Sequence, residues 1–366
     1  MRQSKGAQGV DGASAKAPTI RDVARVAGVS VASVSRVLNG LGPVTEHTRR
    51  KVFDAAAELR YVPHSGARSL STSRTDTVGV ILPDLFGEFF SELIRGLDVA
   101  ARERGLHLLV SSSHDHADDA AAAVRNLRGR VDGLIVMSPH LASANLAASL
   151  VGNLPTLTLN GALDDETQPS IVVDNHGGAA EATRHLIAGG RRSIAHIAGP
   201  AGNLEAEARL AGYLEAMADA GLPSRVIDGD FDQASGHRAG RVLASEAERP
   251  DAVFAGNDMM AVGALLAFRE AGLRCPQDVA LCGFDDVPIA ALVSPGLTTM
   301  RISIADVGRR ALGRLADRIG GAATGQQPMR EIVRPQLVAR ESSLSAGDIG
   351  ATASRAADPV SQGGAR

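Results

Sequence analysis

The sequence of 366 residues contains no tryptophan and few other aromatic residues, with two tyrosines and eight phenylalanines. It has only two cysteines, Cys275 and Cys282, so neither a disulfide framework nor a thiolate metal site is expected. No apolar run reaches the roughly 18 residues that a membrane span needs, and the first 17 residues have no apolar core that could act as a secretion signal. We therefore expect a cytoplasmic protein that contacts no membrane and carries no metal or other cofactor.

What is present indicates a globular protein of more than one domain. Hydrophobic residues make up 44% of the chain and charged residues 22%, and the length suits a small module followed by two larger lobes. Both ends, residues 1–17 and 343–366, are rich in small residues without periodicity, which predicts disordered tails that carry no function.

The charge is unevenly divided along the chain. Residues 1–75 hold 12 Lys and Arg against 5 Asp and Glu, a net charge of +7, whereas residues 76–366 hold 26 against 36, a net charge of −10. A basic module attached to an acidic body is typical of a protein whose one end binds nucleic acid. A merely solvated basic tail is the alternative.

Three helices are predicted within the basic segment. Apolar residues recur at helical spacing from Thr19 to Ala27, and Gly28 ends this helix. Ser30 is expected to cap a second helix that runs to Asn39. A third helix is predicted from about residue 45 to residue 59, with its basic residues outward. This order is typical of a helix-turn-helix module, which we place at residues 18–62.

The second helix has the chemistry of a DNA-recognition helix. Arg36 on its exposed side could read guanine in the major groove, Val31 and Ala32 could touch thymine methyl groups, and Ser33 could reach a phosphate. An ordinary pair of helices with solvated polar residues is the alternative.

From Val78 onward, apolar strand-like runs alternate with Ala-rich helical segments. The runs predicted as strands are residues 78–82, 106–110, 133–137, 156–159, 170–173, 194–198, 252–255 and 279–284. This alternation predicts parallel sheets built from βαβ units, and its length favours two doubly wound lobes over one sheet.

Asn or Asp follows several of these strands. Ligands of open parallel sheets bind beyond the carboxyl ends of the strands, so these side chains predict a polar pocket between two lobes. They are Asp84, Asn160, Asp174, Asn257, Asp258 and Asp285. The alternative is that such residues only cap the next helices, and we expect capping to explain Asp258 and to be an option for Asp84.

The segment at residues 19–39, TIRDVARVAGVSVASVSRVLN, resembles the headpiece of the lactose-repressor/galactose-repressor (LacI/GalR) family of bacterial regulators. The resemblance extends from about Val78 to Ser342 through stretches such as AHIAGP, ARLAGY, GNDMMAVGAL and CGFDD. It implies an all-α helix-turn-helix headpiece, a hinge at residues 63–75, and a periplasmic-binding-protein-like α/β core of two lobes at residues 76–342. The chain is then expected to cross between the lobes near residues 160–175, 298–304 and 328–334.

The resemblance also implies which residues contact operator DNA. Leu70 is expected to wedge into the minor groove from a hinge helix that forms on DNA. His64 stands where the family usually has Asn. The full set predicted for DNA binding is Thr19, Ile20, Ser30, Val31, Ala32, Ser33, Ser35, Arg36, Asn39, His64, Ala67, Arg68 and Leu70.

For the effector, the resemblance implies hydrogen bonding by Arg209, Asn257 and Asp285, with Asn160 from the other lobe. Aromatic residues are expected to form a platform. The full set predicted for effector binding is Asp84, Phe89, Phe90, Asn160, Asp174, Arg209, Phe231, Asn257 and Asp285. Purine-responsive members need an Arg in the stretch that here reads AGNLEAEA, and its absence favours a sugar or sugar derivative over a nucleobase.

We therefore expect a homodimeric repressor that binds near-palindromic operator DNA and is controlled by a small molecule. A regulator of the same family that responds to a nucleoside or another metabolite is the alternative. A transport solute-binding protein would share the two lobes but not the first 75 residues. An enzyme is not expected, because the sequence has no nucleophile elbow, phosphate-binding glycine loop or cluster of metal ligands.

Overall fold

The computed structural model describes residues 18–39, 43–62, 74–114, 116–138, 144–150, 152, 154–161, 169–321 and 328–344. The chain divides into two compact units between Thr75 and Asp76. The smaller unit is the headpiece and the larger unit is the core. In the described parts of both units, none of the helices combines the length and the apolar character that a membrane span needs.

The headpiece consists of three helices. They are α1 (Ile20–Ala27), α2 (Val31–Asn39) and α3 (Glu46–Glu58). Each contributes a fully buried valine to a shared core, Val23, Val34 and Val52 respectively. Gly28 ends α1 with φ of 65°, a left-handed conformation that glycine adopts without strain, and so the chain turns sharply into α2.

The first lobe of the core, which we call the N-lobe, contains a six-stranded parallel sheet. The strand order is β11-β5-β4-β3-β1-β2. The strands are β1 (Thr77–Leu82), β2 (His107–Ser112), β3 (Gly133–Met137), β4 (Thr156–Leu159), β5 (Ser170–Val173) and β11 (Arg330–Val333). The helices are α5 (Glu88–Glu103), α6 (Ala117–Leu127), α7 (Ala144–Leu150) and α12 (Ile304–Ile319). Because β1, β3 and β4 are buried on both faces, they read as continuous apolar runs in the sequence.

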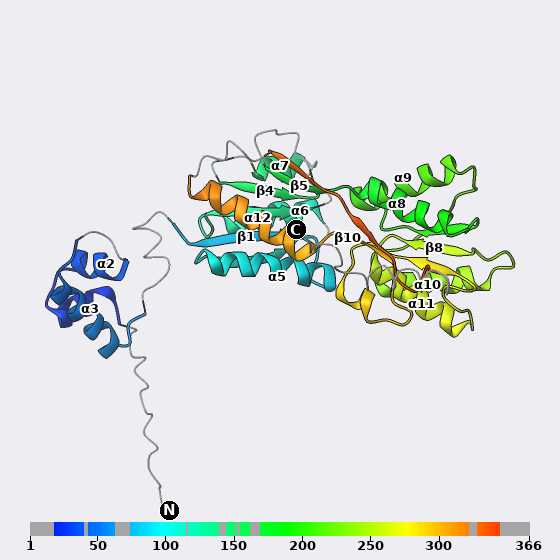
Figure 1. Cartoon of the computed structure of the whole chain (residues 1–366). Helices are drawn as coiled ribbons and strands as arrows, with labels where there is room; N and C mark the ends of the chain where they lie inside the picture. The colour runs from blue at the N-terminus through cyan, green and yellow to red at the C-terminus, as the bar shows by residue number, and fades with distance from the viewer. Residues whose placement is uncertain are drawn as a thin grey trace, which may run out of the picture. The chain divides into compact units, whose positions relative to one another are not determined.

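The second lobe, the C-lobe, contains a four-stranded parallel sheet with the order β7-β6-β8-β9. The strands are β6 (Ile194–Ile197), β7 (Arg225–Ile227), β8 (Ala252–Ala255) and β9 (Ala280–Cys282). Figure 1 shows the helices α8 (Asn175–Ala188) and α9 (Leu204–Asp219) on one side of this sheet and α10 (Gln233–Ser245) and α11 (Asp258–Glu270) on the other.

Three chain segments join the lobes. The chain leaves the N-lobe after β5, returns between β10 (Thr299–Arg301) and α12, and leaves again between β11 and β12 (Gln336–Val338). Strands β10 and β12 pair antiparallel in a small sheet of their own, which is visible between the lobes in Figure 1. The sequence pattern did not predict β7, β10, β11 or β12.

Helices α5 and α12 pack closely on the N-lobe sheet. A side chain at Gly96 would collide with the backbone of Ala305, and one at Gly308 would collide with the backbone of Leu93. The two helices therefore contact each other backbone to backbone at this point. Helix α12 begins only three residues after β10 ends, so this contact lies directly beside a crossing between the lobes.

Candidate functional site

The recognition surface predicted for DNA lies on α2. The Ser30 hydroxyl accepts a hydrogen bond from Ser33 N at 3.1 Å and so caps the helix, as the sequence predicts. Val34 and Val37 face the headpiece core, while Val31, at 42% exposure, and Arg36 face solvent. Ala32 is also exposed and lies four residues before Arg36 on the same helix face, and an exposed apolar residue beside an arginine suits a face that enters the major groove.

Other residues predicted to contact DNA have structural roles in the headpiece. The hydroxyl and backbone N–H of Thr19 donate to Asp22 at 2.7 and 2.9 Å, and these bonds lower the pKa of Asp22 to about 2. Ile20 packs against the headpiece core, and Asn39 donates to the Ser35 hydroxyl at 3.2 Å. The four hinge residues His64, Ala67, Arg68 and Leu70 lie outside the described residues.

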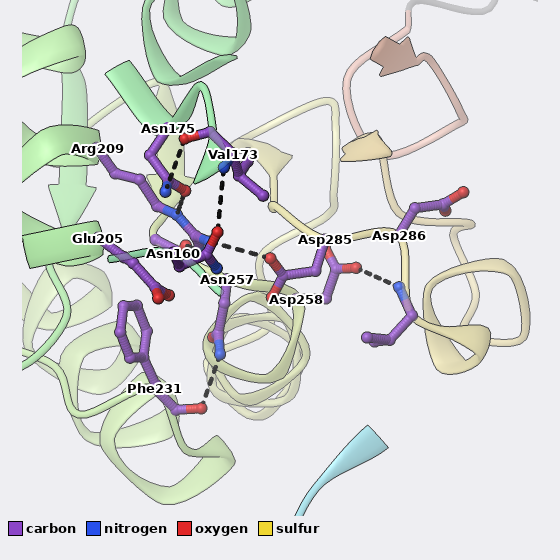
Figure 2. Close-up of polar contacts among 12 residues, drawn as sticks. Asn160, Val173, Asn175, Glu205, Arg209, Phe231, Asn257, Asp258, Asp285 and Asp286 are labelled. Carbon is purple, nitrogen blue, oxygen red and sulfur yellow. Dashed lines mark hydrogen bonds and ion pairs between the residues drawn. The ribbon is translucent and has the colours of Figure 1, made fainter. Parts of the chain in front are cut away.

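In the core, polar side chains meet at the carboxyl edge of the C-lobe sheet. After β6 the chain continues to β7 on one side of the sheet, and after β8 it continues to β9 on the other side. Doubly wound sheets bind ligands at the carboxyl ends of two such neighbouring strands. Arg209 reaches this edge from α9 and is 3% exposed. Its Nε donates to Asn175 Oδ1 at 2.8 Å, its Nη1 to Gly256 O at 2.5 Å, and its Nη2 to Asp285 Oδ1 at 3.2 Å (Figure 2).

Arg209 is also held by aromatic rings. Its guanidinium carbon lies 3.9 Å from the centroid of the Phe284 ring and 5.5 Å from that of Phe231. Phe231 has φ of 57°, which is unusual for a bulky residue, and its carbonyl accepts from Asn257 Nδ2 at 2.8 Å. The ring of Phe231 lies so close to Gly199 that a side chain there would collide with it. The guanidinium is therefore fixed in position before any ligand arrives.

Asp285 lies where the C-lobe edge meets a lobe crossing. It is 5% exposed and has φ of 107°. Its backbone N–H donates to Met300 O at 2.8 Å, on crossing strand β10. Burial raises the pKa of the Asp285 carboxyl to about 7, although the charge of Arg209 opposes the rise, and the negative charge of Glu205 adds to it.

Asp258 does not cap α11, so the capping expected for it was wrong. The cap is Asn257, whose Oδ1 accepts from Met260 N at 2.9 Å. Asp258 is fully buried, and it accepts from the Thr299 hydroxyl at 2.5 Å and from Val287 N at 2.9 Å. Burial and the charge of Asp285 raise its pKa well above the usual range. Asp258 therefore ties α11 to crossing strand β10 and to the loop after Asp285.

The N-lobe presents an apolar cavity at its own carboxyl edge. Two of its lining residues, Phe89 and Asn160, belong to the predicted effector set. The full lining is Phe89, Leu93, Met137, Leu159, Asn160, Val173, Ile302, Ile304 and Val307. Asn160 has φ of 53°, and its Oδ1 accepts from Val173 N at 3.0 Å. Since Asn175 follows Val173 by two residues and contacts Arg209, the polar cluster and the apolar cavity adjoin each other.

The remaining predicted effector residues are placed less centrally. The rings of Phe89 and Phe90 pack edge to face with centroids 5.4 Å apart. The carboxylate of Asp84 accepts from Leu85 N at 2.6 Å and Phe86 N at 3.1 Å within its own loop. Asp174 caps α8 by accepting from Gly177 N at 2.9 Å. The structure thus gives Asp84 and Asp174 local roles in loop and helix formation.

Two residues of this region were missed by the sequence reasoning. Asn175 positions Arg209, and Glu205 lies one helical turn before Arg209 on α9. The stretch that contains Glu205 was considered only for its lack of arginine. Asn175 is the second residue after the predicted strand at residues 170–173. Considering the first two residues after every predicted strand would have found it.

The two thiols have no reactive character. Cys282 is fully buried and Cys275 is partly buried, and burial raises the pKa of the Cys275 thiol to about 12. Within the described residues, no three His, Cys, Asp or Glu side chains are grouped so that they could hold a metal ion.

Comparison with known proteins identifies both units. Residues 19–64 match the model of bacterial regulatory proteins of the lacI family, and residues 183–343 match that of a periplasmic binding protein-like domain. The HTH-type transcriptional repressor PurR of Proteus mirabilis is 35% identical over 332 residues, which cover 88% of this chain and 96% of the relative. The chain belongs to the lacI family of bacterial regulatory proteins. It is a DNA-binding transcriptional repressor rather than an enzyme.

Solved structures of this family agree with the fold. The lac repressor dimer bound to operator and the anti-inducer ONPF has a TM-score of 0.80 at 31% identity, covering 90% of this chain and 100% of that one. The transcriptional regulator CelR in complex with cellobiose has a TM-score of 0.66 at 35% identity, covering 89% and 99%. The headpiece and the two-lobed α/β core of this repressor are therefore those of its family.

Proposed function

We propose that this repressor binds its operator through α2 and the hinge, and that a sugar or sugar derivative held between the lobes controls its operator affinity. The observation that carries the proposal is the fixed position of Arg209 between Asn175, Gly256 and Asp285. A guanidinium that is oriented before the ligand arrives can donate to hydroxyl groups without first losing side-chain entropy.

The supply of hydrogen-bonding groups supports a polyhydroxylated ligand. Arg209 and the Nδ2 group of Asn160 offer donors, Asp285 offers acceptors, and the rings of Phe231 and Phe89 offer apolar faces. A sugar ring has the same division between hydroxyl edges and apolar faces. The complex of the relative CelR with cellobiose is consistent with such a ligand.

The way the lobes are joined supports control by the ligand. Asp285 and Asp258 both bond to crossing strand β10, and Glu88 of the N-lobe accepts from Ile289 N of the C-lobe at 2.9 Å. A ligand that contacts both lobes would favour one arrangement of these crossings over another. The coupling to operator affinity cannot exceed the difference in the ligand's affinity for the two arrangements. We propose a homodimer on a near-palindromic operator, as in the operator complex of the lac repressor dimer.

The effector site is tested by a thermal-shift screen of sugars, sugar phosphates and nucleosides on the full chain. We expect a sugar or sugar derivative to raise the melting temperature, and the Arg209→Ala variant to lose this response. Arg184→Ala is the matched control, because Arg184 is an exposed arginine on α8 whose partners are Glu215 and Asp219. A ligand that stabilises the wild type and Arg209→Ala equally would show that the site lies elsewhere.

The DNA site is tested by gel-shift titration of the repressor's own promoter. Arg36→Ala should relax sequence preference at one base pair of each half-site and weaken binding by about 1–3 kcal/mol. Arg25→Ala is the control, because this exposed arginine of α1 pairs with Asp22. Unchanged sequence preference in Arg36→Ala would exclude Arg36 as a base reader.

A further inference from the structure

The apolar cavity of the N-lobe is linked to the polar cluster of the C-lobe through two of the crossings. Ile302 lines the cavity directly after β10, and its backbone N–H donates to Asp285 O at 3.5 Å. Val173 lines the cavity at the end of β5, and Asn175, two residues later, accepts from Arg209 at 2.8 Å. A ligand that binds Arg209 and Asp285 therefore has the cavity within reach of its other end.

The cavity has room for one small group. Its volume is about 10 Å³, which suits a single group of the size of a water molecule or a methyl group. A second sugar ring or a longer substituent would enter only if the lining moved. The size of the cavity thus limits the part of the ligand that it can take to one carbon atom with its hydrogens.

The lining of the cavity suits a methyl group better than a hydroxyl group. Eight of the nine lining residues are apolar, and the ninth, Asn160, uses its Oδ1 to accept from Val173 N at 3.0 Å. Only the Nδ2 group of Asn160 is then left to bond with a ligand, so the hydrogen of a hydroxyl group would find no side-chain oxygen to accept it. Burying a hydroxyl group without this bond is unfavourable, whereas burying a methyl group is favourable.

We propose that the effector is a 6-deoxy sugar, whose methyl group occupies this cavity while its ring hydroxyl groups bind Arg209 and Asp285. This inference rests on the proposed effector site. A 6-deoxy sugar has a methyl group where the parent hexose has a hydroxymethyl group, so it combines one apolar end with a polar ring. The cavity then discriminates against the parent hexose, because the additional hydroxyl group is both too large for it and unpaired within it.

The proposal is tested by calorimetry on the full chain with matched sugars. Each 6-deoxy sugar is compared with its parent hexose and with the pentose that lacks the sixth carbon. The sets are L-rhamnose with L-mannose and L-lyxose, L-fucose with L-galactose and D-arabinose, D-fucose with D-galactose and L-arabinose, and D-quinovose with D-glucose and D-xylose. We expect one 6-deoxy sugar to bind at least tenfold more tightly than its parent hexose, and more tightly than its pentose. Equal or tighter binding of the parent hexose, or binding of none of the four 6-deoxy sugars, would overturn the proposal.

A first variant makes the cavity polar. Val173→Thr keeps the shape of the side chain and adds a hydroxyl group that can pair with the 6-hydroxyl group of the parent hexose. The preference for the 6-deoxy sugar over the parent hexose should therefore fall at least tenfold. Val172→Thr is the matched control, because Val172 precedes Val173 on β5 and its side chain points to the opposite face of the sheet. An unchanged preference in Val173→Thr would contradict the role of the cavity.

A second variant fills the cavity. Val307 lines it from α12, and Val307→Ile adds one carbon atom to the side chain. The affinity for the 6-deoxy sugar should fall at least tenfold, because its methyl group then has no room, while the affinity for the pentose should stay within about twofold. An equal loss for both sugars would show that the methyl group does not bind in this cavity.

The Arg209→Ala variant separates this proposal from the proposed effector site. If a parent hexose binds best and Arg209→Ala abolishes its binding, the site is right and the 6-deoxy sugar is wrong. If Arg209→Ala leaves the binding of every sugar unchanged, the site itself is wrong.

Discussion

The two lobes present opposite chemistry at the edges that face each other. The C-lobe edge is polar and charged, and Arg209, Asp285 and Asn257 are held there by hydrogen bonds from several chain segments. At the N-lobe edge, a small cavity beyond β3, β4 and β5 is apolar, and Asn160 is its only polar lining residue. In the proposed effector site, this contrast would give a division of labour in which the C-lobe orients the ligand and the N-lobe covers it.

The contrast also predicts how substitutions affect each edge. A buried polar cluster is destabilised when one partner is removed, because the other partner then stays buried without a hydrogen bond or an opposite charge. An apolar surface loses contact area gradually as side chains are shortened. The following predictions are ordered from the largest expected effect to the smallest.

Breaking the ion pair of the C-lobe should have the largest effect. Arg209→Met leaves Asp285 buried without its cation, and at pH 9, where Asp285 of the wild type is ionised, we expect the free energy of unfolding to fall by about 3 kcal/mol. The double variant Arg209→Met/Asp285→Asn should recover most of this loss, because no unpaired charge then remains. Urea titrations of both variants measure the effect. A double variant as unstable as the single one would show that shape, rather than charge, is decisive here.

The pH dependence of stability should reveal Asp285. Its folded pKa, about 7, lies above the usual aspartate value of 3.8, so the folded state retains a proton that the unfolded chain loses. Stability from this group is fully present below pH 3.8 and is lost as the pH rises toward 7, by up to about 1.4 kcal/mol per pH unit. Asp285→Asn should therefore lose less stability than the wild type between pH 5 and 7 in chemical unfolding. Parallel curves would contradict the raised pKa.

Shortening a side chain of the apolar N-lobe cavity should weaken ligand binding by an amount that does not depend on pH. Phe89 lines the cavity and is partly buried, and Phe89→Ala should lower effector affinity about tenfold, or ~1.4 kcal/mol. The loss should be the same at pH 6 and pH 8, in contrast to variants of the C-lobe. Calorimetry at the two pH values distinguishes the edges, and a pH-dependent loss would count against the division of labour.

The hydrogen bond between the lobes should have the smallest effect. Glu88→Ala removes the acceptor for Ile289 N, which is worth about 1 kcal/mol, and effector affinity should change only a few-fold. Glu92→Gln on the same helix is the control, because Glu92 pairs with Arg95 of the N-lobe. A change as large as that of Phe89→Ala would mean that this bond governs closure.

The headpiece was predictable because its signals are local. Helix caps at Ser30 and Thr45, the turn at Gly28 and the apolar spacing all act within a few residues, and the structure has each helix within a residue or two of its expected bounds. In the core, the apolar runs predicted eight strands, most of which are buried on both faces and so leave a continuous apolar signal, whereas β2 is partly exposed. Strands β7, β10, β11 and β12 are short and partly exposed, so they leave no such signal.

The site was predictable only in part, because its contacts are made between distant segments. Strand ends pointed to Asn160, Asn257 and Asp285, but the bond of Asp258 to Thr299 spans 41 residues and has no local signature. Positive φ angles at Asn160, Phe231 and Asp285 are likewise set by tertiary contacts. The residue type at a strand end therefore predicts which side chains lie at the site. The role of each side chain depends on its contacts with the segments that cross between the lobes.

The contact between Gly96 and Gly308 limits how this repressor can change shape. Since the backbones of α5 and α12 touch there, we expect the two helices to move together rather than to slide past each other. We expect movement between the lobes to be concentrated in the few peptide units beside Val173, Arg301 and Val333, where the three chain segments pass between the lobes. Substitutions at either edge can therefore change ligand specificity while the crossings between the lobes stay the same.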